Sequence, residues 1–248
     1  MSIPRFYVPA PLPASGHHVL PEDVAHHAGR VLRLAAGDPI VLFDGTGGEY
    51  HASLGFDGKR AYARIERHVN CERELAGTLR LAQGIASGDK MEWIVEKAVE
   101  LGVAQIQPIA AQRSVLRLQG ERLDKRLAQW RRTAIAAAEQ CGRNRVPALA
   151  APGSLAQYLR EPPAGALLLC HPDATQSLGD ALAHVRPEPG ATLLVGPEGG
   201  WSDEELAIAA RAGAQRVRFG SRVLRTETAG LALLAASAAL LGWQDQEP

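Results

Sequence analysis

Two glycine-containing segments near the carboxyl end of the chain have the composition of ligand-binding loops. In the first, an apolar run ends at Gly196-Pro197-Glu198-Gly199-Gly200, and Ser202 with Glu205 has the capping-box spacing that predicts a helix start. Glycine lacks a Cβ atom and allows positive φ, so a ligand can approach the main-chain amides of such a loop. The amino end of the following helix would direct its positive dipole toward the same loop.

The second segment, residues 219–229, reads F-G-S-R-V-L-R-T-E-T-A and repeats the order of strand, glycine loop and helix start. Neither segment is a phosphate-binding P-loop, which requires Gly-Lys-Ser/Thr, or a G-x-G-x-x-G dinucleotide fingerprint. The first segment alone is also compatible with a plain structural turn. Two such segments so close in the chain favour one ligand pocket lined by main-chain atoms.

Strands and helices alternate from about residue 73 onward, which predicts an α/β fold. Buried strands are expected at 78–85, 103–110, 166–169, 192–195 and 216–219. Helices are expected at 89–101, 123–140 and after Ser177, Ser202 and Thr226. This alternation is typical of a parallel sheet covered by helices on both faces.

The first 70 residues differ from the rest of the chain. Val24, Ala28, Val31 and Leu32 share one face of a predicted helix that opens at Pro21. Short strands are expected at 39–43, 49–54 and 61–65, separated by glycine-containing hairpin turns. Short strands at this spacing predict a small barrel, and we place the domain boundary at residues 72/73.

The two loop motifs, G-P-E-G-G-W-S-x-x-E and R-V-L-R-T-E-T-A, resemble those of a known enzyme family. Further matching stretches are H-H-A-G-R-V-L-R at 26–33, F-D-G at 43–45, K-M-E-W-I-V-E-K-A at 90–98 and E-Q-C-G-R at 139–143. The chain resembles the bacterial 16S ribosomal RNA uracil-N3 methyltransferases (RsmE type) of the SPOUT class. The resemblance implies a PUA-like RNA-binding β-barrel at 1–72 and a SPOUT methyltransferase domain with a C-terminal trefoil knot at 73–248.

The resemblance also implies that S-adenosylmethionine (SAM) binds where three loops meet. The residues that it assigns to SAM are Leu169, His171, Gly196, Pro197, Glu198, Gly199, Gly200, Phe219, Gly220, Val223, Leu224 and Thr226. A cofactor held through main-chain atoms would explain why these loops carry glycines instead of a charged fingerprint. His171 has the alternative role of a simple loop histidine.

Methylation of uracil N3 requires removal of its proton and stabilisation of the charge that develops. Arg225 is the candidate cation, and its alternative role is a salt bridge with Glu227. Glu139 is the candidate general base; pairing with Arg143 or capping a helix is its alternative role. Glu198 is a substitute candidate for the base.

The lysines and arginines equal the acids in number, so the net charge is zero, but the basic residues are clustered. Residues 112–146 contain nine Lys/Arg and three acids, and residues 211–228 contain five Arg and one acid. Such clusters favour RNA as a partner, here 16S ribosomal RNA or the small ribosomal subunit. The candidate RNA contacts are Arg30, Arg33, Arg113, Arg131, Arg132 and Arg143, although Arg30 and Arg33 are equally compatible with solvated helix charges.

Several features limit the other function classes. No apolar run reaches the 18 or so residues that span a bilayer, so we expect a cytoplasmic protein without membrane contact. The three cysteines and the paired histidines lack metal-ligand spacing, so no metal site is expected. The helix at 226–243 is apolar nearly all round, which fits either a buried core helix or the interface of a homodimer.

Three functions remain open on this basis. The first is methylation of N3 of a specific uridine in 16S ribosomal RNA. The second is a SPOUT methylase of another RNA or of ribose, and the third is a non-catalytic RNA-binding assembly factor.

Overall fold

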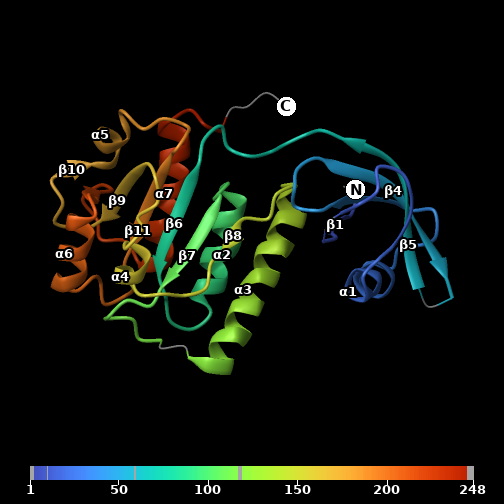
Figure 1. Ribbon diagram of the computed structural model, residues 1–248, viewed down its shortest axis with the longest axis horizontal. Coiled ribbons are helices and arrows are strands. Elements are labelled where there is room, and N and C mark those ends of the chain that lie inside the picture. Colours follow the sequence, from blue (N-terminus) through green and yellow to red (C-terminus); the bar gives the residue numbers. More distant parts are fainter. Residues whose placement is uncertain (1–2, 10, 59, 117–118, 245–248) are drawn as a thin grey trace. The chain divides into compact units, whose positions relative to one another are not determined.

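The computed structural model describes residues 3–9, 11–58, 60–116 and 119–244, which group into two compact units (Figure 1). The first unit contains the chain up to Glu74 together with Ala138–Val146, and the second contains Leu75–Ala137 and the chain from Pro147 onward. The sequence does not anticipate that 138–146 belongs with the first unit. Hydrogen bonds explain this grouping, because Arg143 donates to Glu74 and the amide of Asn144 donates to the carbonyl of Cys71 at 2.8 Å.

The first unit is built on a five-stranded sheet in the order β1-β3-β4-β5-β2. Its strands are β1 (Arg5–Tyr7), β2 (Gly16–Val19), β3 (Pro39–Phe43), β4 (Glu49–Asp57) and β5 (Arg60–Val69). All pairings are antiparallel except that of β1 with β3. The three predicted strands are present, whereas β1 and β2 were not predicted because they are short and lie among prolines, glycine and histidines.

The helix of the first unit changes type along its length. Helix α1 (Glu22–His26) continues directly into a π-helical turn, η1 (His27–Val31). A π-helix bonds i to i+5, so the expected helical face is broken after His26. Val31 and Leu32 are consequently 59% and 44% exposed, contrary to the prediction that they share a buried face with Val24 and Ala28.

The second unit contains a seven-stranded, fully parallel sheet in the order β10-β12-β9-β11-β6-β7-β8. Its strands are β6 (Leu79–Gly84), β7 (Gln105–Ile109), β8 (Ala148–Leu149), β9 (Ala166–Cys170), β10 (Gln176–Ser177), β11 (Ala191–Val195) and β12 (Gln215–Arg218). The predicted α/β fold with a parallel sheet is confirmed. The two-residue strands β8 and β10 are too short to leave a periodic signal in the sequence.

Helices lie on both faces of this sheet (Figure 1). They are α2 (Lys90–Glu100), α3 (Gly120–Cys141), α4 (Leu155–Tyr158), α5 (Leu178–Leu182), α6 (Asp203–Arg211) and α7 (Thr226–Leu240). Helix α7 packs against α2, α5, β6 and β11, and it buries Leu233 and Leu234 completely. Side chains of α4 and α6 form a core with Leu194 of β11 and Leu169 of β9.

The order of the strands determines where the functional loops meet. Strands β12, β9 and β11 are neighbours in the sheet and run in the same direction. Their carboxyl ends, at Arg218, Cys170 and Val195, therefore lie at one edge of the sheet. In open parallel sheets the loops at this edge form ligand crevices.

Candidate functional site

A cavity of about 850 Å³ is formed by the loops that follow β9, β11 and β12. This volume lies in the range of small-molecule sites, roughly 300–1,000 Å³. Its walls are the segments 170–173, 195–201 and 218–226, together with Arg113 and Ala229. The two glycine-containing segments singled out in the sequence thus line the same space.

Hydrogen bonds through Thr226 join two of these loops. The Thr226 hydroxyl donates to the carbonyl oxygen of Gly196 at 2.6 Å and accepts a bond from the amide of Gln83 at 3.0 Å. All three groups lie in the protein interior or at its margin, so the bonds are shielded from water. The start of α7 is therefore tied directly both to the loop after β11 and to the end of β6.

The loop from Gly196 to Gly200 is a tight turn held close to β6. The amide of Gly200 donates to the carbonyl oxygen of Pro197 at 2.8 Å, and Gly200 has a φ of +68° that favours glycine. Gly84, the last residue of β6, approaches so closely that a Cβ atom there would lie 2.4 Å from the nitrogen of Pro197. A glycine at position 84 is required for this contact.

The predicted capping box of α6 is present. The side chain of Ser202 accepts a bond from the amide of Glu205, and the Glu205 carboxylate accepts one from the amide of Ser202. The first turn also contains Asp203 and Glu204. Three carboxylates at the positive end of the helix reduce its attraction for an anionic ligand, so the expected dipole contribution is largely offset.

Glu198 in the first loop is held as a carboxylate. Desolvation raises its pKa, but hydrogen bonds from the hydroxyl and amide of Ser87, from its own amide and from Lys90 outweigh this effect and lower the pKa to about 2. The Ser87 hydroxyl lies 2.7 Å and Lys90 Nζ lies 3.3 Å from Oε1 of Glu198. Lys90 also lies 3.4 Å from Glu227 of α7, so this one cation links the loop after β11 to the start of α7.

Four arginines line the cavity: Arg113, Arg218, Arg222 and Arg225. Arg113 donates to the carbonyl oxygen of Trp201 at 3.1 Å, which attaches its guanidinium to the loop. The alternative salt bridge of Arg225 with Glu227 is not found among the described residues, where Glu227 pairs with Lys90 instead. The exposed guanidinium of Arg225 is thus available to a bound molecule.

The structure places eleven of the twelve residues predicted to bind a cofactor around this cavity; the other, Leu169, is buried one residue before it. His171 lies in the wall, where its Nδ1 accepts a bond from the amide of Asp173 at 3.2 Å. The sequence analysis missed Asp173, Trp201 and Arg218 as wall residues. Their positions directly after β9, after the glycine loop and at the end of β12 were the available signal.

Glu139 is not among the residues that form the cavity wall. It belongs to the first unit, where its carboxylate accepts a hydrogen bond from the amide of Tyr7 at 2.8 Å. Burial raises the pKa of Glu139, an effect that this amide and the nearby His27 and Arg5 only partly counteract. The proposed pairing with Arg143 is replaced by the pairing of Arg143 with Glu74.

The candidate RNA contacts fall into two groups. Arg30, Arg33, Arg113, Arg131 and Arg132 are exposed. Arg143 is only 3% exposed and its guanidinium donates to Glu74, and Arg145 similarly pairs with Glu72, so part of the basic cluster is neutralised within the first unit. Arg117, which also belongs to that cluster, lies outside the described residues.

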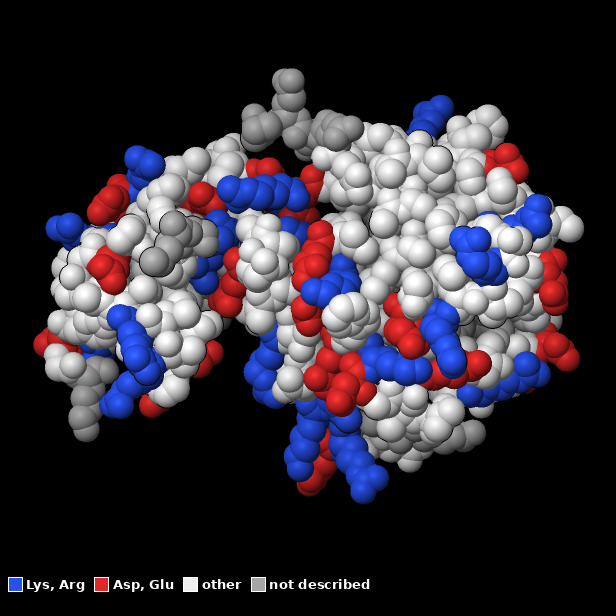
Figure 2. Space-filling view, turned by 180° about the vertical axis from the view of Figure 1, so that it is seen from behind, with Lys and Arg blue, Asp and Glu red and all other residues white. Residues whose placement is uncertain are grey.

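Acidic and basic side chains are interspersed on the face of the molecule drawn in Figure 2, in keeping with the zero net charge.

Across the residues that the structure describes, no group of three or more His, Cys, Asp or Glu is arranged to hold a metal ion. Within the same residues, no helix combines the length and apolar character needed to cross a membrane. Burial raises the pKa of the Cys170 thiol in the cavity wall, so this group stays protonated.

Comparison with known proteins agrees with this geometry. A family model for an RNA methyltransferase domain matches residues 73–238, and one for an RNA methyltransferase PUA domain matches residues 20–66. Ribosomal RNA small subunit methyltransferase E of Synechocystis sp. is 34% identical over 219 residues, which are 87% of this chain and 71% of the relative. The Bacillus subtilis protein of the same name is 32% identical over 221 residues, 86% of each chain.

Solved structures with the same fold include two that contain the methyl donor. The Neisseria gonorrhoeae ribosomal RNA small subunit methyltransferase E bound to S-adenosyl methionine superimposes with a TM-score of 0.88, at 38% identity, over 96% of this chain and 98% of that one. A Legionella pneumophila methyltransferase in complex with SAM gives a TM-score of 0.88 at 34% identity over 98% of both chains. This chain belongs to the ribosomal RNA small subunit methyltransferase E family of RNA methyltransferases.

Proposed function

We propose that this protein transfers the methyl group of SAM to N3 of a specific uridine in the 16S ribosomal RNA of the small subunit. The observation that carries the proposal is the convergence of the loops after β9, β11 and β12 on one cavity, in a family with SAM-bound relatives. The residue types around the cavity agree with a ligand that combines a flat apolar ring with a charged end.

The chain's residues fit SAM in three respects. Val223 and Leu224 supply apolar surface for the adenine ring, and the loop at 196–200 supplies main-chain amides and carbonyls. Trp201 lies in the cavity wall, and its indole Nε1 is a buried donor without a hydrogen-bond partner among the described residues. Asp173 and the arginines of the wall complement the amino and carboxylate groups of the methionine part.

Bound SAM supplies an electrophilic methyl group, and the protein must provide an oriented, deprotonated uracil N3. Arg225 lies in the cavity wall without an ion pair to Glu227, and we assign it the stabilisation of negative charge that develops on the uracil. Lys90, which contacts Glu198 and Glu227, holds the two loops in register so that the reacting groups are aligned.

The identity of the general base is constrained by the two glutamates. The pKa of Glu198 is about 2, so its carboxylate is a weak base near neutral pH. Glu139 has a raised pKa, which suits a base, but its carboxylate is bonded to the Tyr7 amide and is not part of the cavity wall. Within one chain these observations favour a structural role for Glu139.

RNA binding would be divided between the two parts of the chain. Arg113, Arg131 and Arg132 would contact phosphates around the target, and Arg30 and Arg33 would do so from the PUA-like domain at 1–72. Arg143 is better explained as the buried partner of Glu74. We further propose that the protein is a cytoplasmic homodimer and that the chain from β12 through α7 forms the trefoil knot of the SPOUT domain.

The test uses ribosomal RNA from a strain in which the gene is deleted. Mass spectrometry of digested 16S RNA should show the loss of one N3-methyluridine and its return when the purified protein and SAM are added. Loss of a different methylated nucleotide would favour the reading as a methylase of another RNA or of ribose. If every methylated uridine remains and calorimetry shows no SAM binding, the protein is a non-catalytic RNA-binding factor and the proposal is wrong.

A further inference from the structure

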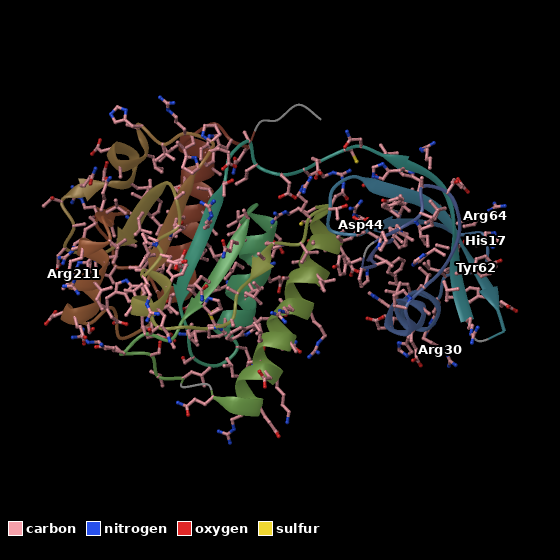
Figure 3. The ribbon with its side chains drawn as sticks, viewed as in Figure 1. His17, Arg30, Asp44, Tyr62, Arg64 and Arg211 are labelled. Carbon is pink, nitrogen blue, oxygen red and sulfur yellow. The ribbon has the colours of Figure 1, made fainter. Side chains whose placement is uncertain are left out.

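The outer face of β2, β5 and β4 carries a stacked pair of rings at the protein surface. Ala61, Ala63 and Ile65 of β5 are buried in the core of the first unit, so the alternate residues Tyr62 and Arg64 point outward. Tyr62 stacks with His17 of β2, with ring centroids 5.0 Å apart and an interplanar angle of 21°. Figure 3 shows His17, Tyr62 and Arg64 together on these strands.

The geometry of the sheet keeps the Tyr62 ring flat. Gly55 of β4 is paired with Tyr62, and a Cβ atom at position 55 would lie 2.3 Å from Cζ of the ring. The ring therefore rests on the bare backbone of Gly55. A side chain other than glycine at this position would push the ring off the sheet and disrupt its stacking with His17.

Arg64 completes the surface beside the rings. In the register of the sheet, Arg64 lies opposite His17 of β2 on one side and opposite Ser53 of β4 on the other. The Nε atom of Arg64 donates a hydrogen bond to the Ser53 hydroxyl at 3.3 Å. This bond orients the guanidinium and leaves its two terminal nitrogens facing solvent as donors. Val19, paired with Tyr62, is 64% exposed and adds apolar surface to the same face.

We propose that His17, Tyr62 and Arg64 form a binding site for one unpaired nucleotide of the ribosomal RNA substrate. The base would stack on the aromatic pair, and the guanidinium of Arg64 would contact the adjacent phosphate. Aromatic rings and arginine planes are the surfaces on which proteins stack single-stranded bases, whatever the base sequence. The proposal rests on the proposed function, because that function makes RNA the partner.

Two further features bear on how a nucleotide would be held at this surface. β2 is the edge strand of its sheet, so its outer backbone groups are open to hydrogen bonds with a base edge. Asp57 and Glu66 flank the surface and offset the charges of Arg60 and Arg64. Binding would therefore depend mainly on stacking, with one phosphate contact from Arg64.

The test measures the affinity of the full-length protein for a single-stranded 16S RNA oligonucleotide by fluorescence anisotropy over a range of salt concentrations. His17→Ala and Tyr62→Ala should each weaken binding about tenfold, the loss expected for one stacked base. Tyr62→Phe should bind like the wild type because it keeps the ring. Arg64→Gln should reduce the slope of log Kd against log salt by about 0.7, as expected for one phosphate contact.

Matched controls separate this site from the catalytic chemistry. Arg160→Gln removes an exposed arginine outside the basic clusters at 112–146 and 211–228 and should leave the affinity unchanged. With small subunits as substrate, His17→Ala should raise KM and leave kcat and SAM affinity at the wild-type values. The inference would be overturned if the His17 and Tyr62 variants methylate RNA with the same KM and bind it with the same affinity as the wild type. The proposed function would then still stand.

Two other outcomes also decide the question. A raised KM for assembled subunits with an unchanged Kd for protein-free RNA would mean that the face contacts a ribosomal protein, and the nucleotide site would be wrong. If the wild type methylates no RNA, the proposed function fails. The anisotropy series then still shows whether His17 and Tyr62 bind single-stranded RNA. Circular dichroism melting curves verify that each variant is folded.

Discussion

Arg225 is the residue on which the chemistry of the cavity most depends. It is exposed in the wall, and the acid two positions along the chain pairs with Lys90 instead. Because Arg225 has no ion pair among the residues that the structure describes, no such pair has to be broken when negative charge develops on a substrate.

Replacing Arg225 by glutamine should therefore slow methyl transfer without unfolding the protein. We expect kcat to fall by about 100-fold or more, the loss seen when one charge-stabilising donor is removed from an active site. SAM affinity, measured by calorimetry, should stay within about threefold of the wild type if Arg225 acts in the transition state. Arg160→Gln, at an exposed arginine outside both basic clusters, is the control, and near-normal turnover of Arg225→Gln would remove Arg225 from the mechanism.

Glu139 is expected to act as an anchor for Tyr7. Glu139→Gln keeps an oxygen that can accept the Tyr7 amide but removes any base function, so kcat should remain close to the wild-type value. Glu139→Ala should lower the free energy of unfolding by about 1 kcal/mol, because the partly buried amide of Tyr7 loses its hydrogen-bond acceptor. Glu121→Gln, at an exposed position of α3, is the control. A large loss of kcat in Glu139→Gln would instead identify the general base.

Glu198 should make stability depend on acidity. Its folded pKa of about 2 is below the usual value of 4.5, so its contribution is fully present above pH 4.5 and is lost as the pH falls toward 2. Denaturant unfolding of the wild type and Glu198→Gln should show a stability difference at pH 6 that narrows at pH 3. A difference that does not change with pH would show that the bonds from Ser87 and Lys90 do not lower this pKa.

The glycine loops could be predicted from the sequence because two segments close together in the chain repeat the order of strand, glycine loop and helix start. The wall positions of Trp201, Asp173 and Arg218 were not predicted, because their residue types do not mark them. Only their places after the glycine loop and near the ends of β9 and β12 could have indicated them. The hydrogen bond from Gln83 to Thr226 joins positions far apart in the chain, and only the order of the strands brings them together. The fold class and the two glycine loops could thus be predicted from local sequence patterns. The other residues of the cavity wall are brought together by the order of the strands in the sheet, which the sequence does not reveal.

Among the secondary-structure elements, β6 has an unusual role because its last residue supports the loop after β11. Gly84 does not have a positive φ, so its backbone would accept alanine, but the Cβ atom would collide with Pro197. The position of the 196–200 loop thus depends on the absence of a Cβ atom at position 84 of the neighbouring strand β6.

Gly84→Ala should displace this loop. We expect weaker SAM binding and a loss of about 1–3 kcal/mol in the free energy of unfolding, the usual cost of overpacking a tight contact. Gly179→Ala in α5 is the control, because a Cβ atom there meets only the Ser177 hydroxyl, at 3.9 Å. Unchanged SAM affinity in Gly84→Ala would show that the loop adapts without affecting the site.

The α1–η1 helix and the segment 138–146 show why the first unit was harder to predict than the second. Apolar residues at helical spacing predicted one buried face, but the π-helical turn rotates Val31 and Leu32 into solvent. The segment 138–146 has no pattern that ties it to the first unit; its membership depends on pairing with Glu72 and Glu74.

For the molecule as a whole, α7 is the element that would connect two copies. It is buried against α2 and the sheet along one side, and yet Leu240 near its end is 61% exposed. A large apolar side chain at the end of a nearly all-apolar helix is compatible with burial in a dimer.

The proposed homodimer can be tested at this position. The wild type should sediment as a dimer in analytical ultracentrifugation, and Leu240→Arg should shift it toward the monomer because a buried charge without a partner is costly. Phe56→Arg, at a residue of β4 that is 40% exposed, should leave the dimer intact. A monomeric wild type at micromolar concentration would contradict the proposal.

The membership of residues 138–146 in the first unit also has a consequence for biosynthesis. While the polypeptide emerges from the ribosome, the amide of Tyr7 and the acids at 72 and 74 are made long before Glu139, Arg143 and Arg145, their eventual partners. The amino-terminal unit therefore cannot acquire its full set of bonds until more than half of the nascent chain has been translated. An expression fragment that stops at residue 74 would leave those groups without their native contacts.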